Sequence, residues 1–374
     1  MGNQRAYVIR ISRSEKYVEA VDSAFDLIEP HPNPVPEEFR HIPILKQVGK
    51  IKRHLGPIFS DIYHSNERTV IIINAVDEFA AVVGLLCEKL GIPFIVRLRG
   101  TMWNEFQDRA HNKSKLRRWI YSNRRETVRD FVFSLADGVI PVTDFVVTQM
   151  LYETDVSRDK VKAINNTVDV DRFEATTPGG FKEYHNIAKE DKILLTVTNF
   201  NYTRKYEAIE YFAPAINSIL RDHENWHFVV VGRGEDFATT RKSILDEFDD
   251  EVSDRVLFTG YCSDIEKAFV DASICTHLSF RDSAAMTVTE AQAAGKPVVV
   301  NTAGGMRDLL DSISDSPPMI ISERDELEHT LSELIESTKK RHCIGDHNKE
   351  YIQSKFSSEL LGKEFEEAIE KFVT

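Results

Sequence analysis

The sequence predicts a mixed α/β protein with two doubly wound domains, each built on a parallel β-sheet. Two observations predict this class. Short apolar runs rich in β-branched residues alternate with longer helical patterns along nearly the whole chain, which is typical of parallel βαβ units. The chain has 374 residues, of which 42% are hydrophobic, so two domains can each bury a core of their own.

Four strands are predicted in the first half of the chain. Each is a buried apolar run followed by a helix-compatible segment, and residues 78–90 show the clearest apolar stripe at helical spacing. The predicted strands are Ala6–Ile11, Thr69–Asn74, Pro93–Leu98 and Gly138–Val142.

The second half repeats this alternation after a linker at Thr176–Tyr184, which contains one proline and two glycines. The domains are therefore expected at residues 1–175 and 176–353. The predicted helices are Tyr206–Leu220, Asp264–Phe269 and Thr287–Ala294. The predicted strands are Lys192–Thr198, Trp226–Val231, Arg255–Thr259, Ile274–Leu278 and Pro297–Val300.

Charge and cysteine usage restrict the partners and the compartment. The formal net charge is −13, from 47 Lys and Arg against 60 Asp and Glu, which disfavours nucleic acid as a partner. The balance is +1 over residues 1–175 and −14 over residues 176–374, so the halves are expected to face different partners. The 4 scattered cysteines, the absence of a long apolar run and the absence of a signal pattern predict a cytoplasmic protein with reduced thiols.

The strongest motif lies in the second half and reads H-L-S-F-R-D-S-A-A-M-T-V-T-E-A-Q-A-A-G-K-P-V-V-V. It resembles the nucleotide-sugar domain of retaining glycosyltransferase family 4, which has the GT-B fold. That family carries a Glu-x7-Glu pair, and Asp282 and Glu290 occupy the two positions, with Asp282 one methylene shorter than the usual Glu. Ser283, Ala284 and Ala285 stand where Gly-Phe-Gly is common.

The resemblance implies two Rossmann-like domains facing across a cleft, in the GT-B manner. Residues 1–175 would bind the acceptor and residues 176–353 the donor, and a last helix within residues 354–374 would pack back on the first domain. A nucleoside-diphosphate sugar is the expected donor. Since it is a substrate, no cofactor is expected.

Each part of this motif has a physical reason. A loop that opens onto a helix offers free N–H groups and a positive dipole for a diphosphate, here from Ala285, Met286 and Thr287. Glu290 would accept hydrogen bonds from the ribose, and Asp282 from the transferred sugar. The competing interpretation is a helix N-cap at Asp282 and a solvated helix residue at Glu290.

A second cation-bearing motif, L-T-V-T-N-F-N-Y-T-R-K, ends at Lys205. The family places a Lys here, and Arg204 adjoins it, so both would stabilise charge on the leaving diphosphate. The family's Arg and Gly are replaced by Asn199 and Thr198. The alternative is that Lys205 caps a surface turn.

Glycines after two further strands fall where the family holds the nucleotide. The run V-V-V-G-R-G-E-D-F supplies Gly232 and Gly234, and Gly260 and Tyr261 follow the next strand. A lone G-x-G is a weak dinucleotide signal, and simple strand-ending turns explain these residues equally well.

The first half is similar to the family over A-D-G-V-I-P-V-T-D-F and V-K-A-I-N-N-T-V-D-V-D-R-F. Asp169 and Asp171 form a D-x-D pattern there, which we interpret as a structural loop between the domains. No other cluster has metal-ligand spacing, so a metal-independent site is expected. Arg99 stands where many relatives carry a His, and it would bind a sugar hydroxyl or an acceptor phosphate, or else form an interface salt bridge. Ser12–Lys16 lacks the family's Gly-rich loop.

Residues 113–129 contain seven cations, one acid and the aromatic residues Trp119 and Tyr121, and Lys46–Arg53 adds four cations. A basic amphipathic helix of this kind is suited to the anionic inner face of a membrane and to a lipid-linked acceptor. The alternative is a solvated helix with one core stripe.

The resemblance implies a retaining glycosyltransferase of hexosyltransferase type that acts on a glycan or a lipid-linked acceptor. Asp282, Lys205 and Arg99 form the expected catalytic set. Two other functions share the fold: a non-catalytic GT-B subunit and a nucleotide-sugar 2-epimerase. The epimerase normally uses carboxylates and a His in the cleft, and the sequence alone identifies no such His.

Overall fold

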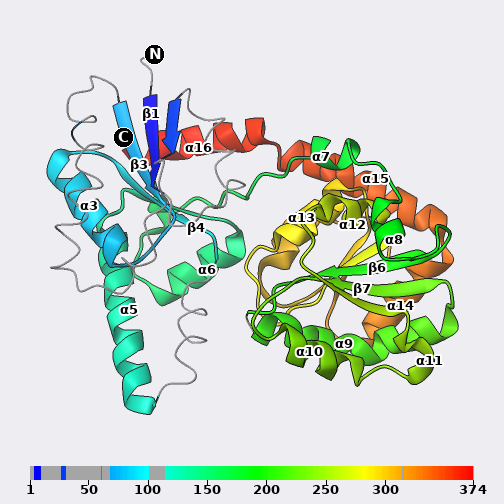
Figure 1. The fold of residues 1–374 in the computed structure, drawn as a ribbon. Helices are drawn as coiled ribbons and strands as arrows, with labels where there is room; N and C mark the ends of the chain where they lie inside the picture. The colour runs from blue at the N-terminus through cyan, green and yellow to red at the C-terminus, as the bar shows by residue number, and fades with distance from the viewer. Residues whose placement is uncertain are drawn as a thin grey trace. The chain divides into compact units, whose positions relative to one another are not determined.

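The fold was analysed in a computed structural model of the whole chain (Figure 1). The structure describes residues 4–9, 27–30, 60, 68–100, 114–201, 203–313, 316–317 and 319–373. Ser12–Lys16, Lys46–Arg53 and Lys113 of the basic stretch lie outside these ranges. The chain divides into two compact units, residues 1–167 with 358–374, and residues 168–357.

The first unit contains a parallel five-stranded sheet in the order β2-β1-β3-β4-β5. Its strands are β1 (Gln4–Ile9), β2 (Leu27–Pro30), β3 (Arg68–Ile73), β4 (Phe94–Leu98) and β5 (Gly138–Pro141). Its helices are α3 (Glu78–Leu90), α5 (Lys115–Leu135), α6 (Asp144–Glu153), the 3₁₀ turn η3 (Arg158–Lys160) and α16 (Ser358–Val373).

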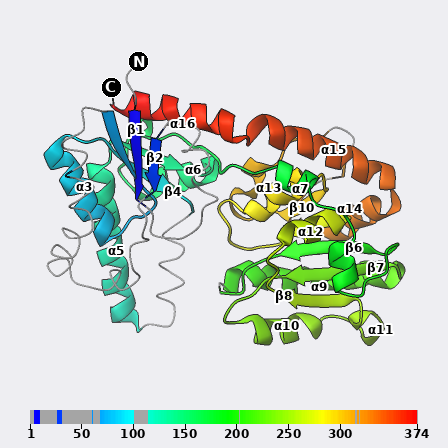
Figure 2. The same cartoon turned by 45° about the horizontal axis from the view of Figure 1, so that its top comes forward.

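The C-terminal helix α16 belongs to the first unit although it is the last element of the chain. Its buried face includes Leu361 and Phe365, which share a core with Ile72, Ile95 and Ile140 of the sheet. The helix therefore closes one face of this sheet (Figure 2).

The second unit contains a parallel six-stranded sheet in the order β11-β10-β9-β6-β7-β8. Its strands are β6 (Lys192–Val197), β7 (Trp226–Val231), β8 (Val256–Gly260), β9 (Ile274–His277), β10 (Val298–Asn301) and β11 (Ile320–Ile321). Its helices are α7 (Asp171–Glu174), α8 (Gly180–Tyr184), α9 (Thr203–Asp222), α10 (Phe237–Leu245), α11 (Asp250–Ser253), α12 (Ile265–Asp271), α13 (Met286–Ala293), η4 (Gly304–Leu309), α14 (Arg324–Glu336) and α15 (Thr338–Lys355).

Successive strand residues of this sheet feed two separate cores, as the two-residue period of a strand requires. Leu194 packs with α9 and α14 on one face, whereas its neighbours Ile193 and Leu195 pack with α12 and α13 on the other. Both faces are covered, which confirms the predicted doubly wound α/β class.

Two short strands, β2 and β11, were not predicted from the sequence. Leu27–Pro30 includes a Glu and a Pro, and Ile320–Ile321 is two residues long, so neither shows a strand pattern of its own. Both are edge strands that are defined by pairing with a longer neighbour. Their identity depends on tertiary contact more than on local propensity.

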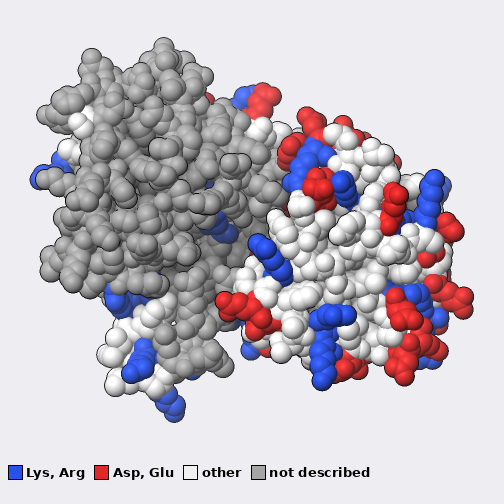
Figure 3. All heavy atoms as spheres, in the orientation of Figure 1, with Lys and Arg blue, Asp and Glu red and all other residues white. Residues whose placement is uncertain are grey.

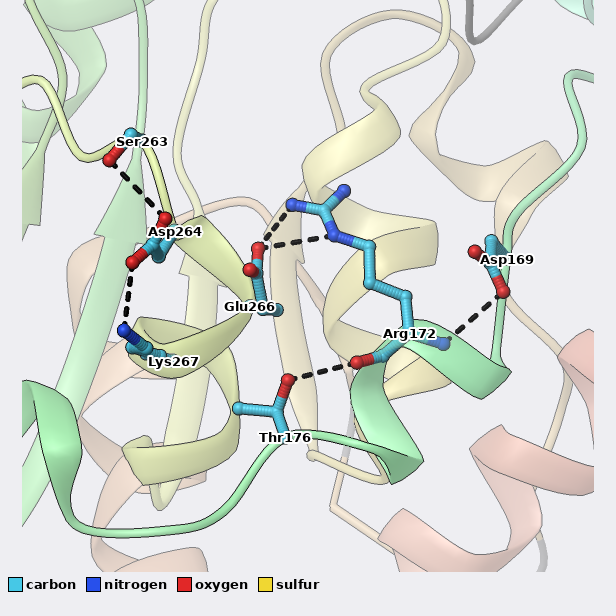
Figure 4. A network of polar contacts seen from close by, with 7 residues as sticks. All are labelled: Asp169, Arg172, Thr176, Ser263, Asp264, Glu266 and Lys267. Atoms are coloured by element: carbon cyan, nitrogen blue, oxygen red, sulfur yellow. Dashed lines mark hydrogen bonds and ion pairs between the residues drawn. The ribbon is translucent and has the colours of Figure 1, made fainter.

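Residues 168–175, which the sequence analysis placed before the domain boundary, pack in the second unit. The Phe173 ring contacts Phe269 edge-on at 6.0 Å, and the Arg172 guanidinium pairs with Glu266 of α12 (Figure 4). The Asp169 carboxylate accepts the Arg172 backbone N–H at 3.2 Å, just before α7 begins. The D-x-D pattern thus has a structural use here.

Charge is mixed on the second unit despite its excess of acidic residues. On the face shown in Figure 3, acidic and basic side chains alternate around the rim of this unit. This face of the unit presents no single-sign patch. Within the described ranges, no helix has the length and apolar character needed to span a bilayer.

Candidate functional site

The strand order of the second unit marks where a ligand site is expected. The chain runs outward from β6 to β7 and β8, then returns to the other side of β6 to form β9 and β10. The crossover connections diverge between β6 and β9, and such a switch point opens a crevice at the carboxyl ends of the strands. Lys205 follows β6, and Asp282 follows β9.

The structure brings Lys205 and Asp282 together, although they are 77 residues apart in sequence. The Lys205 Nζ donates to Asp282 Oδ2 at 2.9 Å, and the Asp282 side chain is only 12% exposed. Burial by itself would raise the pKa of Asp282, but Lys205 and His277 together outweigh it and hold that pKa well below the usual value. The Asp282 carboxylate is therefore charged at neutral pH.

Backbone hydrogen bonds fix the Asp282 loop from two directions. The Phe280 N–H donates to the Arg204 carbonyl at 3.0 Å, which joins this loop to the start of α9. The Gly305 N–H donates to the Asp282 carbonyl at 3.1 Å, and the Ser283 N–H donates to Asp282 Oδ1 at 2.9 Å. The loop is thereby held to the start of α9 and to η4 at once.

His277, at the end of β9, is a site residue that the sequence analysis missed. Its side chain is 7% exposed, and its Nε2 lies 3.3 Å from Asp282 Oδ2. Its Nδ1 lies 3.1 Å from Thr287 Oγ1 in the first turn of α13. The signal in the sequence was a polar residue ending an apolar strand five positions before Asp282, but a lone His in an apolar strand is equally typical of a core.

Helix α13 begins beside this network. Ala285 is its N-cap, and Met286 and Thr287 form its first turn, where helix N–H groups lack intrahelical partners. Glu290 lies in the same helix and is 7% exposed, which excludes the solvated helix position considered above. The start of the helix, Asp282 and Lys205 therefore adjoin one another.

The glycines after β7 permit a close approach of loops at the same sheet edge. A Cβ at Gly232, where φ is +154°, would lie 2.0 Å from the Thr198 carbonyl oxygen. A Cβ at Gly234 would lie 2.2 Å from the Phe200 carbonyl carbon. These two glycines are needed for β7 and the loop after β6 to pack, which is a structural reason for the G-x-G.

The remaining residues proposed from the sequence differ in their surroundings. Arg204 pairs with Glu207 of its own helix at 2.9 Å and is exposed. The Gly260 carbonyl accepts the Gly232 N–H at 2.9 Å, and the exposed Tyr261 ring lies under the Arg233 guanidinium at 4.3 Å.

Asn199 and Arg99, which both differ from the family pattern, also have defined surroundings. Asn199, where the family has Arg, accepts the Asn201 N–H at 2.8 Å and so shapes the loop after β6. Arg99 follows β4 in the first unit and is half-buried. Among the residues that the structure describes, no three His, Cys, Asp or Glu side chains converge as a metal-ligand group.

Gly304 offers a test of the Asp282 loop. Its φ is +76°, and a Cβ there would lie 1.7 Å from the Asp282 carbonyl oxygen. Gly304→Ala is therefore expected to push this loop away from Lys205 and to lower kcat/KM about tenfold or more, because small displacements of a site are costly. The measurement is steady-state kinetics with the donor.

The matched control is Gly91→Ala, since Gly91 has φ +66° but nothing within 4 Å of the added Cβ. That variant carries the same backbone strain of about 1–2 kcal/mol without the clash. Equal kcat/KM for the two variants would mean that activity does not depend on the position of the Asp282 loop.

Comparisons with known proteins find similarity to glycosyltransferases. Residues 191–337 match the family model of the glycosyl transferases group 1. The chain is 23% identical over 277 residues to a protein named as a glycosyltransferase from a virus (isolate Australia/Victoria), covering 73% of this chain and 76% of that protein. It is also 23% identical over 277 residues to the lipopolysaccharide 1,2-N-acetylglucosaminetransferase of Salmonella typhimurium, covering 70% and 72%.

Solved structures of other proteins share this fold. The Anabaena protein HepE in complex with UDP superposes with a TM-score of 0.73 at 15% identity, covering 98% of this chain and 99% of that one. The same protein has also been solved with UDP-glucose, where the TM-score is 0.70. WaaG, a glycosyltransferase involved in lipopolysaccharide biosynthesis, gives a TM-score of 0.65 at 12% identity, with coverage of 98% and 99%.

Proposed function

We propose that this chain, whose residues 191–337 match the glycosyl transferases of group 1 and which has the GT-B fold, moves a hexosyl group from a nucleoside-diphosphate sugar to an acceptor hydroxyl with retention at the anomeric carbon. The observation that carries this proposal is the Lys205–Asp282 pair beside the start of α13. A cation, a carboxylate and a helix N-terminus lie next to one another there, at the switch point of the six-stranded sheet.

Each group would have a separate task. Lys205, with Arg204 beside it, would stabilise the charge that develops on the leaving diphosphate, and the α13 N–H groups would bind its oxygens. The Asp282 carboxylate would accept hydrogen bonds from the transferred sugar, and Glu290 from the ribose. These fixed charges would serve the diphosphate without an added divalent cation, so we propose a metal-independent reaction. HepE binds UDP and UDP-glucose, which supports a nucleotide-sugar donor.

The first experiment is nucleoside diphosphate release by the purified protein over a panel of nucleotide sugars, in EDTA and then with metal restored. Release from one donor in EDTA, stimulated by a total lipid or glycan extract, is the expected result. Isomerised free sugar would favour the 2-epimerase instead. Thermal stabilisation by a donor without any release would favour a non-catalytic subunit.

We further propose that the acceptor lies at an anionic membrane surface and that α5 contacts this surface. Residues 114–120 are all exposed, including Leu116 at 67%, Trp119 at 63% and Ile120 at 52%. These three share a helix face at i, i+3 and i+4 spacing, next to Lys115, Arg117 and Arg118. At the lower left of Figure 3, where Figure 1 shows this end of α5, basic and uncharged side chains lie together.

The C-terminal part of α5 packs against the rest of the first unit. Arg124 pairs with the buried Glu78 of α3 at 2.8 Å, and Val132 and Phe133 are buried. Helix α5 is thus anchored at one end and exposes an apolar and basic face at the other, as interfacial helices do. This arrangement supports peripheral membrane contact, which we place at the inner leaflet.

Trp119→Ala with Ile120→Ala is expected to reduce binding to vesicles of mixed phosphatidylcholine and phosphatidylserine about tenfold or more, because two deeply inserting side chains are lost. Co-sedimentation measures the effect. Tyr152→Ala is the control, since Tyr152 is 87% exposed on α6 of the same unit. If the double variant binds the vesicles as well as the wild-type protein does, contact through α5 is refuted.

A further inference from the structure

We infer that His277 is a positioning residue that takes over the Asp282 carboxylate when the donor diphosphate draws Lys205 away. The inference deepens the proposed function and rests on it for its kinetic consequence. His277 itself would touch neither the sugar nor the phosphate.

The need for a second partner follows from the ion pair itself. The Lys205 Nζ, 2.9 Å from Asp282 Oδ2, is also the cation proposed for the diphosphate. A diphosphate bound there competes with Asp282 for the same ammonium group. A carboxylate that is 12% exposed and loses its cation is destabilised by its burial unless another donor is at hand.

His277 is placed to be that donor. Its Nε2 lies 3.3 Å from the same Oδ2 that Lys205 contacts. This buried nitrogen makes no well-aligned hydrogen bond in the present arrangement. Its bonding capacity is therefore still available, and a small rotation of the Asp282 carboxylate toward the ring would complete the bond.

The other ring nitrogen fixes which atom carries the proton. Nδ1 lies 3.1 Å from Thr287 Oγ1, and a hydroxyl can donate as well as accept. An Nε2 lone pair facing a carboxylate would be repulsive, so the favoured neutral ring has its proton on Nε2 and accepts from the Thr287 hydroxyl. A protonated ring would also present Nε2–H to Asp282.

The contacts form one chain across the site: Lys205 on α9, Asp282 on its loop, His277 on β9 and Thr287 on α13. Binding of a diphosphate at the start of α13 and exchange of Asp282 from Lys205 to His277 would thus be linked events. The Asp282 carboxylate would keep its position beside the sugar while Lys205 moves from Asp282 to the diphosphate.

The test is a double-mutant cycle in the full chain, with kcat and KM measured for the active donor. His277→Leu is expected to lower kcat/KM about tenfold or more, mainly through kcat, whereas His277→Gln, which keeps a donor near Oδ2, should stay within about threefold of wild type. In an Asp282→Asn background, His277→Leu should have little further effect, because the carboxylate that it holds is gone.

Thr276→Val is the matched control, since Thr276 is the neighbouring strand residue, is equally buried and bonds Thr196 Oγ1 instead. Its effect on kinetics should be small and should add to that of Asp282→Asn. Independent, additive effects of His277→Leu and Asp282→Asn would overturn the inference, as would a His277→Leu variant with wild-type kcat.

A second measurement does not depend on the proposed reaction. Long-range ¹H–¹⁵N correlation spectra of the chain labelled with ¹⁵N-histidine report which ring nitrogen carries the proton. The signals that are lost in His277→Gln belong to His277. They should show a protonated Nε2 both with and without UDP. A ring protonated on Nδ1 alone would overturn the inference even if no donor is turned over. Failure of every panel donor with a protonated Nε2 would instead count against the proposed function alone.

Discussion

Lys205→Met and Asp282→Asn are each expected to lower kcat/KM about 10²–10³-fold, the usual cost of removing one preorganised charge from an active site. Lys205→Met removes the cation proposed for the diphosphate, and Asp282→Asn removes the acceptor proposed for the sugar. Nucleoside diphosphate release measures both variants, and circular dichroism shows whether they remain folded.

A second Lys–Asp pair in the same unit provides the control. Lys267 Nζ lies 2.8 Å from Asp264 Oδ2, but both side chains are about half exposed (Figure 4). Lys267→Met and Asp264→Asn should leave the activity unchanged, because exposed ion pairs contribute little. Full activity of Lys205→Met and Asp282→Asn would remove both residues from the proposed site.

The lowered pKa of Asp282 also sets the pH range in which the pair can work. A carboxyl whose folded-state pKa is depressed gives its stabilisation above the unfolded pKa of about 4, and loses it as the pH falls through the lower folded value. Between about pH 5 and 8 Asp282 should stay charged. An acidic limb of the activity profile in this range should therefore persist in Asp282→Asn.

Arg97→Leu is expected to destabilise the first unit by about 3–5 kcal/mol, because several buried acceptors would lose their donor. Arg97 is 4% exposed in β4, and its Nη1 donates to the Ile164 carbonyl at 2.6 Å. Its Nη2 donates to the Asn165 carbonyl at 3.2 Å and to Asn166 Oδ1 at 3.1 Å. The guanidinium also lies 5.0 Å over the Phe365 ring of α16.

Thermal unfolding followed by calorimetry should show the transition of the first unit lowered by roughly 10 °C. Arg97→Lys should recover only part of the loss, since an ammonium group cannot match the planar guanidinium fork. Arg117→Ala, on the exposed end of α5, is the control and should change stability by less than about 0.5 kcal/mol. An Arg97→Leu transition at the wild-type temperature would show that these hydrogen bonds contribute little.

Arg97 shows what a strand pattern leaves open. It lies inside the predicted strand Pro93–Leu98, and that pattern says nothing of the partners of its side chain. In the structure its side chain is directed to the last carbonyl of β5, to carbonyls further along the chain and to α16. Ile164, Asn165 and Asn166 are 67–69 residues away, and no local pattern could have identified them.

The parts of the candidate site that could be predicted are those whose residues lie close together in the sequence. The seven residues between Asp282 and Glu290 place a carboxylate before a helix and another inside it, and both positions follow from local structure. The same holds for Lys205 in the first turn of α9. His277 was not predictable, because only its contacts with Asp282 and Thr287 distinguish it from a core histidine.

The alternation of strands and helices, the charge asymmetry and the residue types of the candidate site all follow from the order of the amino acids. The strand order does not, and it is this order that puts β6 beside β9 and so brings Lys205 to within 2.9 Å of Asp282. Folding in three dimensions also gives Arg97 a structural place. The difference arises because periodicity and turn chemistry act over a few residues, whereas strand pairing and burial join residues that are far apart in the chain.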